Sequence, residues 1–183
     1  MNQRQFLLIM LIPAIVILSI IAVNWFTIFF GTEILLKTQP VDPRDMFRGD
    51  YVNLNYEISS VDLNKTPYDH DFIYGDMIYA SLSKKDKFWT IDSVSHSKPV
   101  LDEDQVCMKG KVESIWSDRV SIDWGIESYF VPEGEGLPIE QQENAGNVSA
   151  IVSVDFRCSS VLRQLLINDE PVELWQYAHK DAQ

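Results

Sequence analysis

Positive charge is scarce in this 183-residue chain. Lysine and arginine together number 15 against 27 aspartates and glutamates, which gives a formal net charge of −12 at pH 7. Because so acidic a protein is repelled by phosphate backbones, the composition argues against nucleic-acid binding. The length suits one ordinary domain after any membrane segment, and no internal repeat, long linker or low-complexity run divides the chain.

Histidine is also scarce, and a glycine-rich phosphate loop is missing. Three scattered histidines suggest no Ser-His-Asp arrangement, and nothing indicates a nucleotide cofactor. Asp69, His70 and Asp71 are adjacent, but neighbouring side chains of an extended chain point in alternate directions. His96 and His179 have no partner at ligand spacing. The sequence therefore predicts no metal site, no cofactor and no catalytic residue.

Charged side chains are absent from residues 6–30, "FLLIMLIPAIVILSIIAVNWFTIFF". As a helix this segment would span about 37 Å, against about 30 Å of hydrocarbon in a bilayer. A cleaved signal peptide would have a shorter apolar core followed by small residues, which "AVNWFTIFF" does not offer. We therefore interpret residues 1–5 as a short tail, 6–30 as an uncleaved single-pass anchor and 31–183 as the domain that it carries.

The orientation of the anchor is not decided by positive charge alone. Arg4 lies before the apolar segment, whereas Lys37, Arg44 and Arg48 follow it. Long polar domains translocate largely regardless of charge, and an acidic domain is repelled by an anionic cytoplasmic leaflet. We therefore expect a cell-membrane protein whose carboxy-terminal domain lies on the extracytoplasmic side.

The domain after the apolar segment shows period-two alternation, which is typical of β-strands. In "YVNLNYEI", for example, the apolar side chains at alternate positions fall on one face of an extended strand. The segments with strand character are 51–58, 76–82, 87–94, 106–116, 119–124, 127–131, 148–158 and 160–167. One short helix is expected at residues 137–146. The pattern predicts a mainly β fold, a single antiparallel sandwich or small barrel.

The segment before the first long strand, "PVDPRDMFRGDY", combines turn residues with charge. Asp42 begins a predicted β-turn, and Gly49 bends the backbone ahead of the strand. Two interpretations stay open. Arg44 and Arg48 can pair with neighbouring aspartates and fix the turn over the membrane. Alternatively, they form with Tyr51 a patch for a lipid head group or a membrane partner.

Two short segments resemble a known family. Residues 49–56 read GDYxxLxY, and together with the preceding "PVDPRDMFR" they resemble the defining motif of the GDYXXLXY protein family. Residues 125–136, "GIESYFVPEGEG", are similar to its second conserved segment. The resemblance covers most of residues 34–168 and implies an amino-terminal membrane segment and a multi-span membrane partner. The family usually has a glycine in the last hairpin turn, where this chain has Asp169 and Glu170.

An envelope enzyme is the competing interpretation. One apolar span followed by a β domain that opens with Gly-Asp resembles the layout of a signal peptidase. That family places a nucleophilic serine about eight residues before the Gly-Asp, and a serine needs a base to become reactive. The matching position here is Val41, and no serine lies between Phe30 and Gly49. The layout is therefore present without a recognisable nucleophile.

The two cysteines, Cys107 and Cys158, pose a redox question. A bridge between them would close a loop of about 50 residues and stabilise the fold by roughly 4 kcal/mol. Strand alternation, however, places Cys107 on a polar face with Lys109 and Lys111, and Cys158 on an apolar face with Phe156. This parity favours two separate thiols over a bridge.

Together these observations predict a membrane-anchored accessory or binding subunit for another integral membrane protein. The two segments of family resemblance are expected to lie next to each other in the fold. The residues predicted to bind the partner are Asp42, Arg44, Arg48, Gly49, Asp50, Tyr51, Tyr129 and Glu133.

Overall fold

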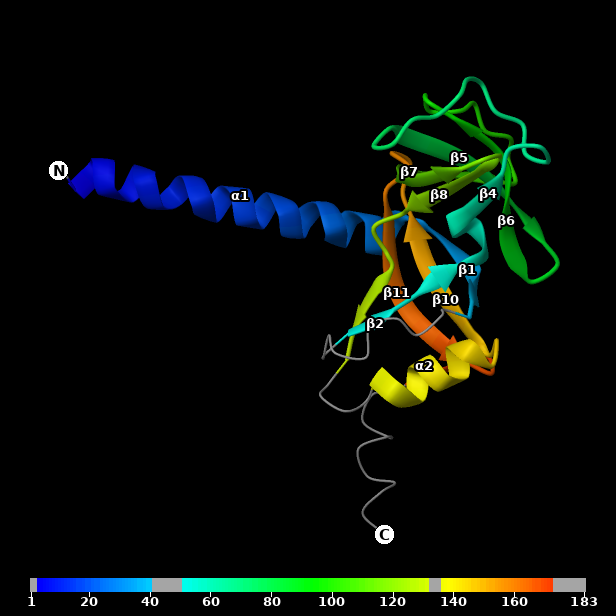
Figure 1. The fold of residues 1–183 in the computed structure, drawn as a ribbon. Helices are drawn as coiled ribbons and strands as arrows, with labels where there is room; N and C mark the ends of the chain where they lie inside the picture. The colour runs from blue at the N-terminus through cyan, green and yellow to red at the C-terminus, as the bar shows by residue number, and fades with distance from the viewer. Residues whose placement is uncertain (1–2, 41–50, 132–135, 173–183) are drawn as a thin grey trace, which may run out of the picture.

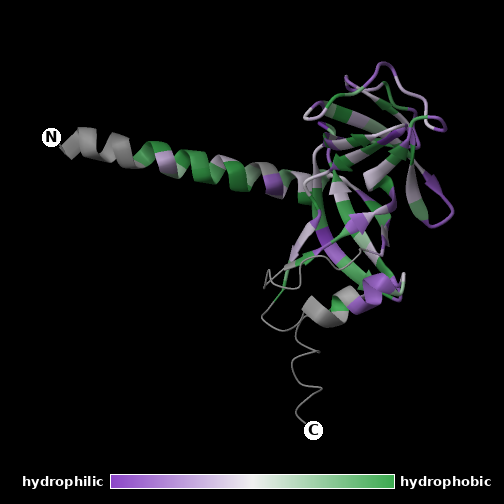
Figure 2. Ribbon diagram, in the orientation of Figure 1, coloured by the Kyte–Doolittle hydropathy of each residue, from purple (hydrophilic) through white to green (hydrophobic). Residues whose placement is uncertain are grey.

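The structure, a computed structural model, describes residues 3–40, 51–131 and 136–172. A single long helix, α1 (Gln3–Phe30), extends away from a β domain (Figure 1). Residues 11–30 are mostly apolar (Figure 2) and long enough to cross a membrane. Nearly all of their described side chains are exposed. This helix is consistent with a membrane anchor or a signal sequence.

The domain is built from short strands and one further α-helix, α2 (Gly136–Asn144), in the part of the chain that the structure describes. The strands are β1 (Thr32–Gln39), β2 (Tyr51–Asn53), β3 (Asn55–Tyr56), β4 (Ser60–Asp62), β5 (Met77–Lys85), β6 (Phe88–Ser95), β7 (Gln105–Trp116), β8 (Arg119–Asp123), β9 (Ser128–Phe130), β10 (Val148–Val154), β11 (Ser160–Ile167) and β12 (Glu170–Pro171). A 3₁₀ turn, η1 (Glu57–Ser59), separates β3 from β4.

All ladders between these strands are antiparallel. One sheet has the order β12-β11-β10-β1-β3 and the other β4-β8-β7-β5-β6, while β2 and β9 form a separate two-stranded ribbon. The sheets curl into part of a barrel, which confirms the predicted mainly β, antiparallel fold with one short helix (Figure 1). Alternation explains the core: along β1, Ile34, Leu36 and Thr38 are buried, and the residues between them are less buried.

Both sheets contribute to one hydrophobic core. Its largest fully buried side chains include Tyr56, Ile34, Leu36, Leu54, Ile78, Leu82, Met108, Ile122, Ile139 and Leu165. These come from β1, β3, β5, β7, β8, β11, α2 and the residue between β2 and β3, so the core spans the whole domain.

The segment 51–58 differs from the predicted single strand. Val52, Leu54, Tyr56 and Ile58 are all buried, as the alternation predicts. The strand is nevertheless divided, because β2 pairs with β9 whereas β3 pairs with the end of β1. Its two halves have different partners, so the ladder breaks at Leu54, whose N–H bonds the Glu127 carbonyl oxygen at 2.7 Å.

The last hairpin turn forms without the glycine that the family pattern has. Asn168 and Asp169, between β11 and β12, take φ values of 52° and 70°. Two consecutive residues with positive φ are typical of the two-residue hairpin turns that match the twist of paired strands. Asn and Asp adopt positive φ more readily than other residues with side chains. Lys87 of the β5–β6 turn pairs with Asp169.

Helix α1 joins the domain without a linker, since β1 begins two residues after α1 ends. The buried Thr27 hydroxyl donates to Asp155 Oδ2 at 2.9 Å, and Ser153 Oγ donates to the Ile28 carbonyl oxygen at 3.4 Å. The ring of Phe26 meets that of Phe156 edge to face, with centroids 6.0 Å apart. The turn Asp155–Ser159, which we call the junction turn, therefore holds the end of the helix.

Asp155 organises the junction turn. Burial opposes its ionisation, but the Arg157 guanidinium and the Ser159 N–H hold its pKa below the usual range of an aspartate. The carboxylate also accepts a bond from the Arg157 N–H at 2.9 Å. A single buried side chain thus joins the helix end to the loop between β10 and β11.

Cys107 and Cys158 form a disulfide, with Cα atoms 4.8 Å apart, which corrects the prediction of separate thiols. Strand alternation does not apply to Cys158, because the strand predicted over residues 148–158 ends before that residue. Strand β10 ends at Val154, and Cys158 lies in the junction turn with φ 64°, so its side chain follows no strand alternation. Cys107 is itself buried, under this turn, and the Lys109 N–H bonds the Cys158 carbonyl oxygen at 2.8 Å.

Candidate functional site

The two segments singled out in the sequence lie side by side, as predicted. Strand β2 holds Tyr51–Asn53 of the first segment (49–56), and β9 holds Ser128–Phe130 of the second (125–136). The cross-strand partners are Tyr51 with Phe130, Val52 with Tyr129 and Asn53 with Ser128. We call these segments the first and second signature.

Hydrogen bonds from buried side chains fasten the first signature to the second signature and to α2. The phenol of Tyr56, fully buried in the first signature, donates to the Ile126 carbonyl oxygen of the second at 2.8 Å. The carboxylate of Glu143, 2% exposed on α2, accepts a bond from the Asn55 N–H at 3.2 Å. Burial, with the nearby charges of Glu127 and Glu143, raises the pKa of Tyr56, so the phenol stays a donor at neutral pH.

The two signatures line a groove of about 630 Å³, which we call the signature groove. The first signature contributes Asn53, Leu54 and Asn55, and the second contributes Gly125, Glu127 and Ser128. Glu113 and Asp123 add carboxylates from β7 and β8. The lining is mostly polar side chains with hydrogen-bonding capacity, which suits recognition of a polar or cationic group.

Glu127 is the carboxylate in the groove with the most altered chemistry. Burial raises its pKa to about 7, and the neighbouring Asp123 carboxyl adds to the increase. In the opposite direction, the Trp124 N–H donates to Oε1 at 2.6 Å. The Ile126 N–H donates to Oε2 at 2.8 Å. Glu127 therefore gains or loses a proton near neutral pH.

This pKa gives an expected pH dependence of stability. An unfolded glutamate releases its proton near pH 4.5, whereas folded Glu127 keeps it to about pH 7. Because the folded chain binds more protons in that window, this residue's contribution to the free energy of unfolding decreases as pH rises from about 4.5 to 7. Urea unfolding of the wild type and Glu127→Gln across the window is expected to show a steeper decrease in the wild type, because His96, whose pKa is also raised, contributes equally to both curves. Glu113→Gln controls for net charge, and parallel curves for wild type and Glu127→Gln would contradict the assignment.

The predicted binding residues are described only in part. The backbone of Tyr51 pairs with Phe130, and Tyr129 is half-buried against the core, where burial raises its pKa. The remaining members lie outside the described residues: Asp42, Arg44, Arg48, Gly49, Asp50 and Glu133. The two interpretations of the basic turn therefore stay predictions.

Sequence reasoning missed the groove carboxylates and the packed helix residue Glu143. The sequence did indicate that Asn53 and Asn55 occupy the polar positions that alternate with the buried ones in the first signature. Glu127 and Glu143, however, look like ordinary surface acids in an acidic chain. Only the fold, which pairs the ribbon and docks α2, shows that Glu143 is buried and Glu127 partly so.

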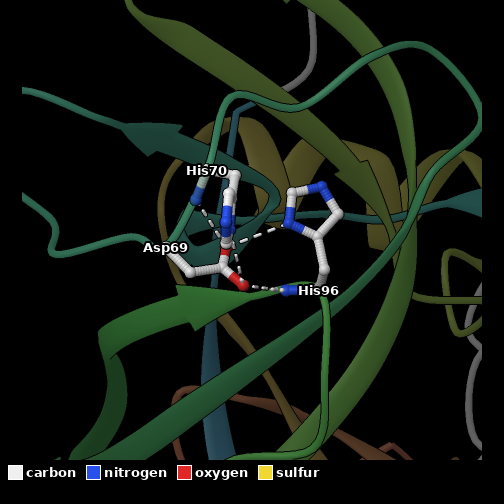
Figure 3. Close-up of side chains that lie close together, drawn as sticks. All are labelled: Asp69, His70 and His96. Atoms are coloured by element: carbon white, nitrogen blue, oxygen red, sulfur yellow. Dashed lines mark hydrogen bonds and ion pairs between the residues drawn. The ribbon is translucent and has the colours of Figure 1, made fainter.

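A second polar cluster lies away from the groove and consists of Asp69, His70 and His96 (Figure 3). Asp69 Oδ1 lies 2.9 Å from His96 Nδ1, and Asp69 Oδ2 lies 3.5 Å from His70 Nδ1. The expectation that His96 has no neighbour at ligand spacing was wrong, because the chain between residues 70 and 96 folds back in space. The hydrogen bond that His96 donates to the Asp69 carboxylate raises the pKa of His96.

Comparison with known proteins agrees with the resemblance of the two signatures. The family model described as GDYXXLXY protein matches residues 13–165, a range that includes both signatures and most of α1. No curated protein and no solved structure matches the chain.

Proposed function

We propose that this chain, which belongs to the GDYXXLXY protein family, is a membrane-anchored binding or accessory subunit. In this proposal α1 remains in the cell membrane as a single-pass anchor, and the domain lies on the extracytoplasmic side. The β2–β9 ribbon and the signature groove are presented to a multi-span membrane protein.

The observation that carries the proposal is the direct seating of the domain on the apolar helix. Thr27, Ser153 and Asp155 fix the helix end to the domain, and Gly31 alone separates α1 from β1. A domain joined in this way stays close to the bilayer and cannot swing freely. Its binding surface therefore keeps a fixed height and direction, which suits contact with a neighbouring integral membrane protein better than with a soluble one.

The surface of α1 supports the same interpretation. Ile12, Leu18 and Phe29 are each more than 60% exposed, and the helix meets the domain only near its carboxyl end in the described residues, where Phe26 packs on Phe156. Aromatic rings gather at its carboxyl end, where Trp25 and Phe30 accompany Phe26 and Phe29. Aromatic side chains favour the membrane interface, so this end suits the boundary between lipid and water.

The disulfide supports an extracytoplasmic domain. Bridges persist in oxidising compartments and are rare in the cytoplasm. Cys107 and Cys158 are both buried, and the bridge connects β7 to the junction turn, so it is part of the structural core of the domain.

Site-specific crosslinking in intact membranes tests the proposal. A photoreactive residue at Ser128, exposed on the ribbon, is expected to capture an integral membrane protein. The same residue at Val100, which is 99% exposed, is the matched control and is expected to capture none. Asn53→Arg, which places a bulky charge opposite Ser128, should reduce capture at least tenfold, whereas Asn64→Arg should not. Equal capture from both positions, or recovery of the mature chain without residues 1–30, would contradict the proposal.

One observation favours an envelope enzyme as the second candidate. Glu127 with its pKa of about 7 beside Asp123 resembles a pair of carboxyl groups prepared for proton transfer. For an enzyme, Glu127→Gln should abolish turnover of a lipid or peptide substrate while capture at Ser128 is kept. If the chain is an accessory subunit, Asn53→Arg should instead abolish capture of the partner.

A further inference from the structure

We propose that Asp69, His70 and His96 form a binding site for a divalent transition metal, with Zn²⁺ as the best fit. The proposal goes beyond the function proposed above and does not depend on it, because the cluster shares no residue with the signature groove. It rests on how the backbone brings three donors together and on how two of them are held in advance.

The backbone sets the position of the cluster. The segment that carries Asp69 runs beside β6, an edge strand of its sheet. The Val94 N–H bonds the Pro67 carbonyl oxygen at 3.0 Å, and Tyr68 forms a parallel bridge with Val94. His96 follows directly after β6, so these bonds fix the spacing between the two segments. The donor atoms of the three residues all lie within 4.8 Å of one another.

The Asp69 carboxylate is held by the backbone. The His70 N–H donates to Oδ1 at 2.8 Å, and the His96 N–H donates to Oδ2 at 2.9 Å. Both bonds come from the residues that supply the other two ligands. The carboxylate therefore faces the two imidazole rings (Figure 3).

The His96 ring is fixed from two other directions. It stacks on the Phe72 ring, with centroids 4.3 Å apart. Its Nε2 lies 3.4 Å from Asp76 Oδ2, and that carboxylate oxygen accepts the Ile73 N–H at 2.8 Å. A histidine that ligates a metal commonly donates its second ring N–H to a carboxylate, which orients the ring and leaves the first nitrogen for the ion. Asp76 is placed for that role, and Nδ1 faces Asp69.

The donor set decides which ion fits. Two imidazole nitrogens with one carboxylate suit zinc and related metals, whereas calcium and magnesium prefer mostly oxygen ligands. Zinc ligands at about 2.0–2.1 Å stand roughly 3.4 Å apart in a tetrahedron. The side chain of His70 is 80% exposed, so it can turn toward the other two without disturbing packing. Three protein ligands leave a fourth position for water.

A bound ion would join the segment 63–76 to the end of β6. These residues form the connection between β4 and β5, which is largely irregular. The ion would take the place of the hydrogen bond between His96 Nδ1 and Asp69 Oδ1. It would therefore hold this connection against the edge strand β6.

Zinc titration of the full-length chain in detergent, after treatment with a chelator, tests the site. The expected result is saturable binding of one Zn²⁺ per chain, measured by equilibrium dialysis and elemental analysis. Co²⁺ used in place of Zn²⁺ should give the visible absorption of a tetrahedral site.

Variants connect the binding to these residues. His70→Gln, at an exposed position, is expected to weaken Zn²⁺ binding at least tenfold without changing the thermal transition of the metal-free chain. His96→Gln should weaken it about a hundredfold. Asp71→Asn removes the adjacent carboxylate that is outside the cluster and should bind as the wild type does. Binding by His70→Gln and His96→Gln as tight as that of the wild type, or no saturable binding at all, would overturn the proposal.

Discussion

Replacing both cysteines with alanine is expected to lower the free energy of unfolding by about 4 kcal/mol. The bridge joins residues 51 apart, so breaking it frees a long loop in the unfolded chain. In a domain of this size the loss corresponds to a fall in Tm of roughly 10 °C. Alanine is the better replacement, because serine would place hydroxyl groups at two positions that are nearly fully buried.

The measurement is urea unfolding of the full-length chain in detergent, with and without reductant. Reductant should destabilise the wild type by about the same amount as the double substitution, and it should leave the double variant unchanged. A wild type whose midpoint does not respond to complete reduction, verified by intact mass, would contradict the expectation.

Gly31→Ala is expected to destabilise the junction between α1 and the domain by about 3 kcal/mol. A Cβ at Gly31 would contact the Thr27 carbonyl oxygen and would lie 2.9 Å from both the Val154 carbonyl oxygen and Ser153 Oγ. Two of these atoms belong to the backbone and cannot turn aside. The helix end must therefore move away from the domain, which weakens the bond from Thr27 to Asp155.

Gly146→Ala is the matched control for this substitution. Gly146 has φ +76° after α2, and a Cβ there would meet nothing within 4 Å. Gly146→Ala should lower the free energy of unfolding by only about 1 kcal/mol, because the alanine would be strained in a left-handed backbone conformation. Urea unfolding measures both variants, and protease sensitivity near residue 31 reports the junction directly. Equal effects of the two substitutions would show that the crowding at Gly31 is unimportant.

Strand alternation predicted most of the fold because burial follows period two wherever a strand keeps one face to the core. Val52, Leu54, Tyr56 and Ile58 were assigned correctly even though the segment is divided into two strands and a turn. The division depends on which strand each half pairs with, and pairing partners leave no trace in local alternation. The helix α2 was visible because Pro138 and Gly146 mark its ends.

The candidate sites were harder to predict, because they depend on distant contacts. Strand alternation predicted separate thiols, but alternation applies only as far as the end of β10, and Cys158 lies beyond it. The cluster of Asp69, His70 and His96 is assembled by a loop that returns to an edge strand. For the groove, the family resemblance indicated the two signatures, and their pairing was expected. The raised pKa of Glu127 could not be predicted from the sequence, because it arises mainly from burial.

The junction turn has a mechanical consequence for the whole protein. Through Asp155 it grips the end of α1, and through Cys158 it is covalently tied to β7 of the opposite sheet. Any tilt or rotation imposed on the end of α1 would therefore be transmitted to both sheets together, and under the proposed function the domain would follow the movements of the helix in the membrane as a single rigid unit.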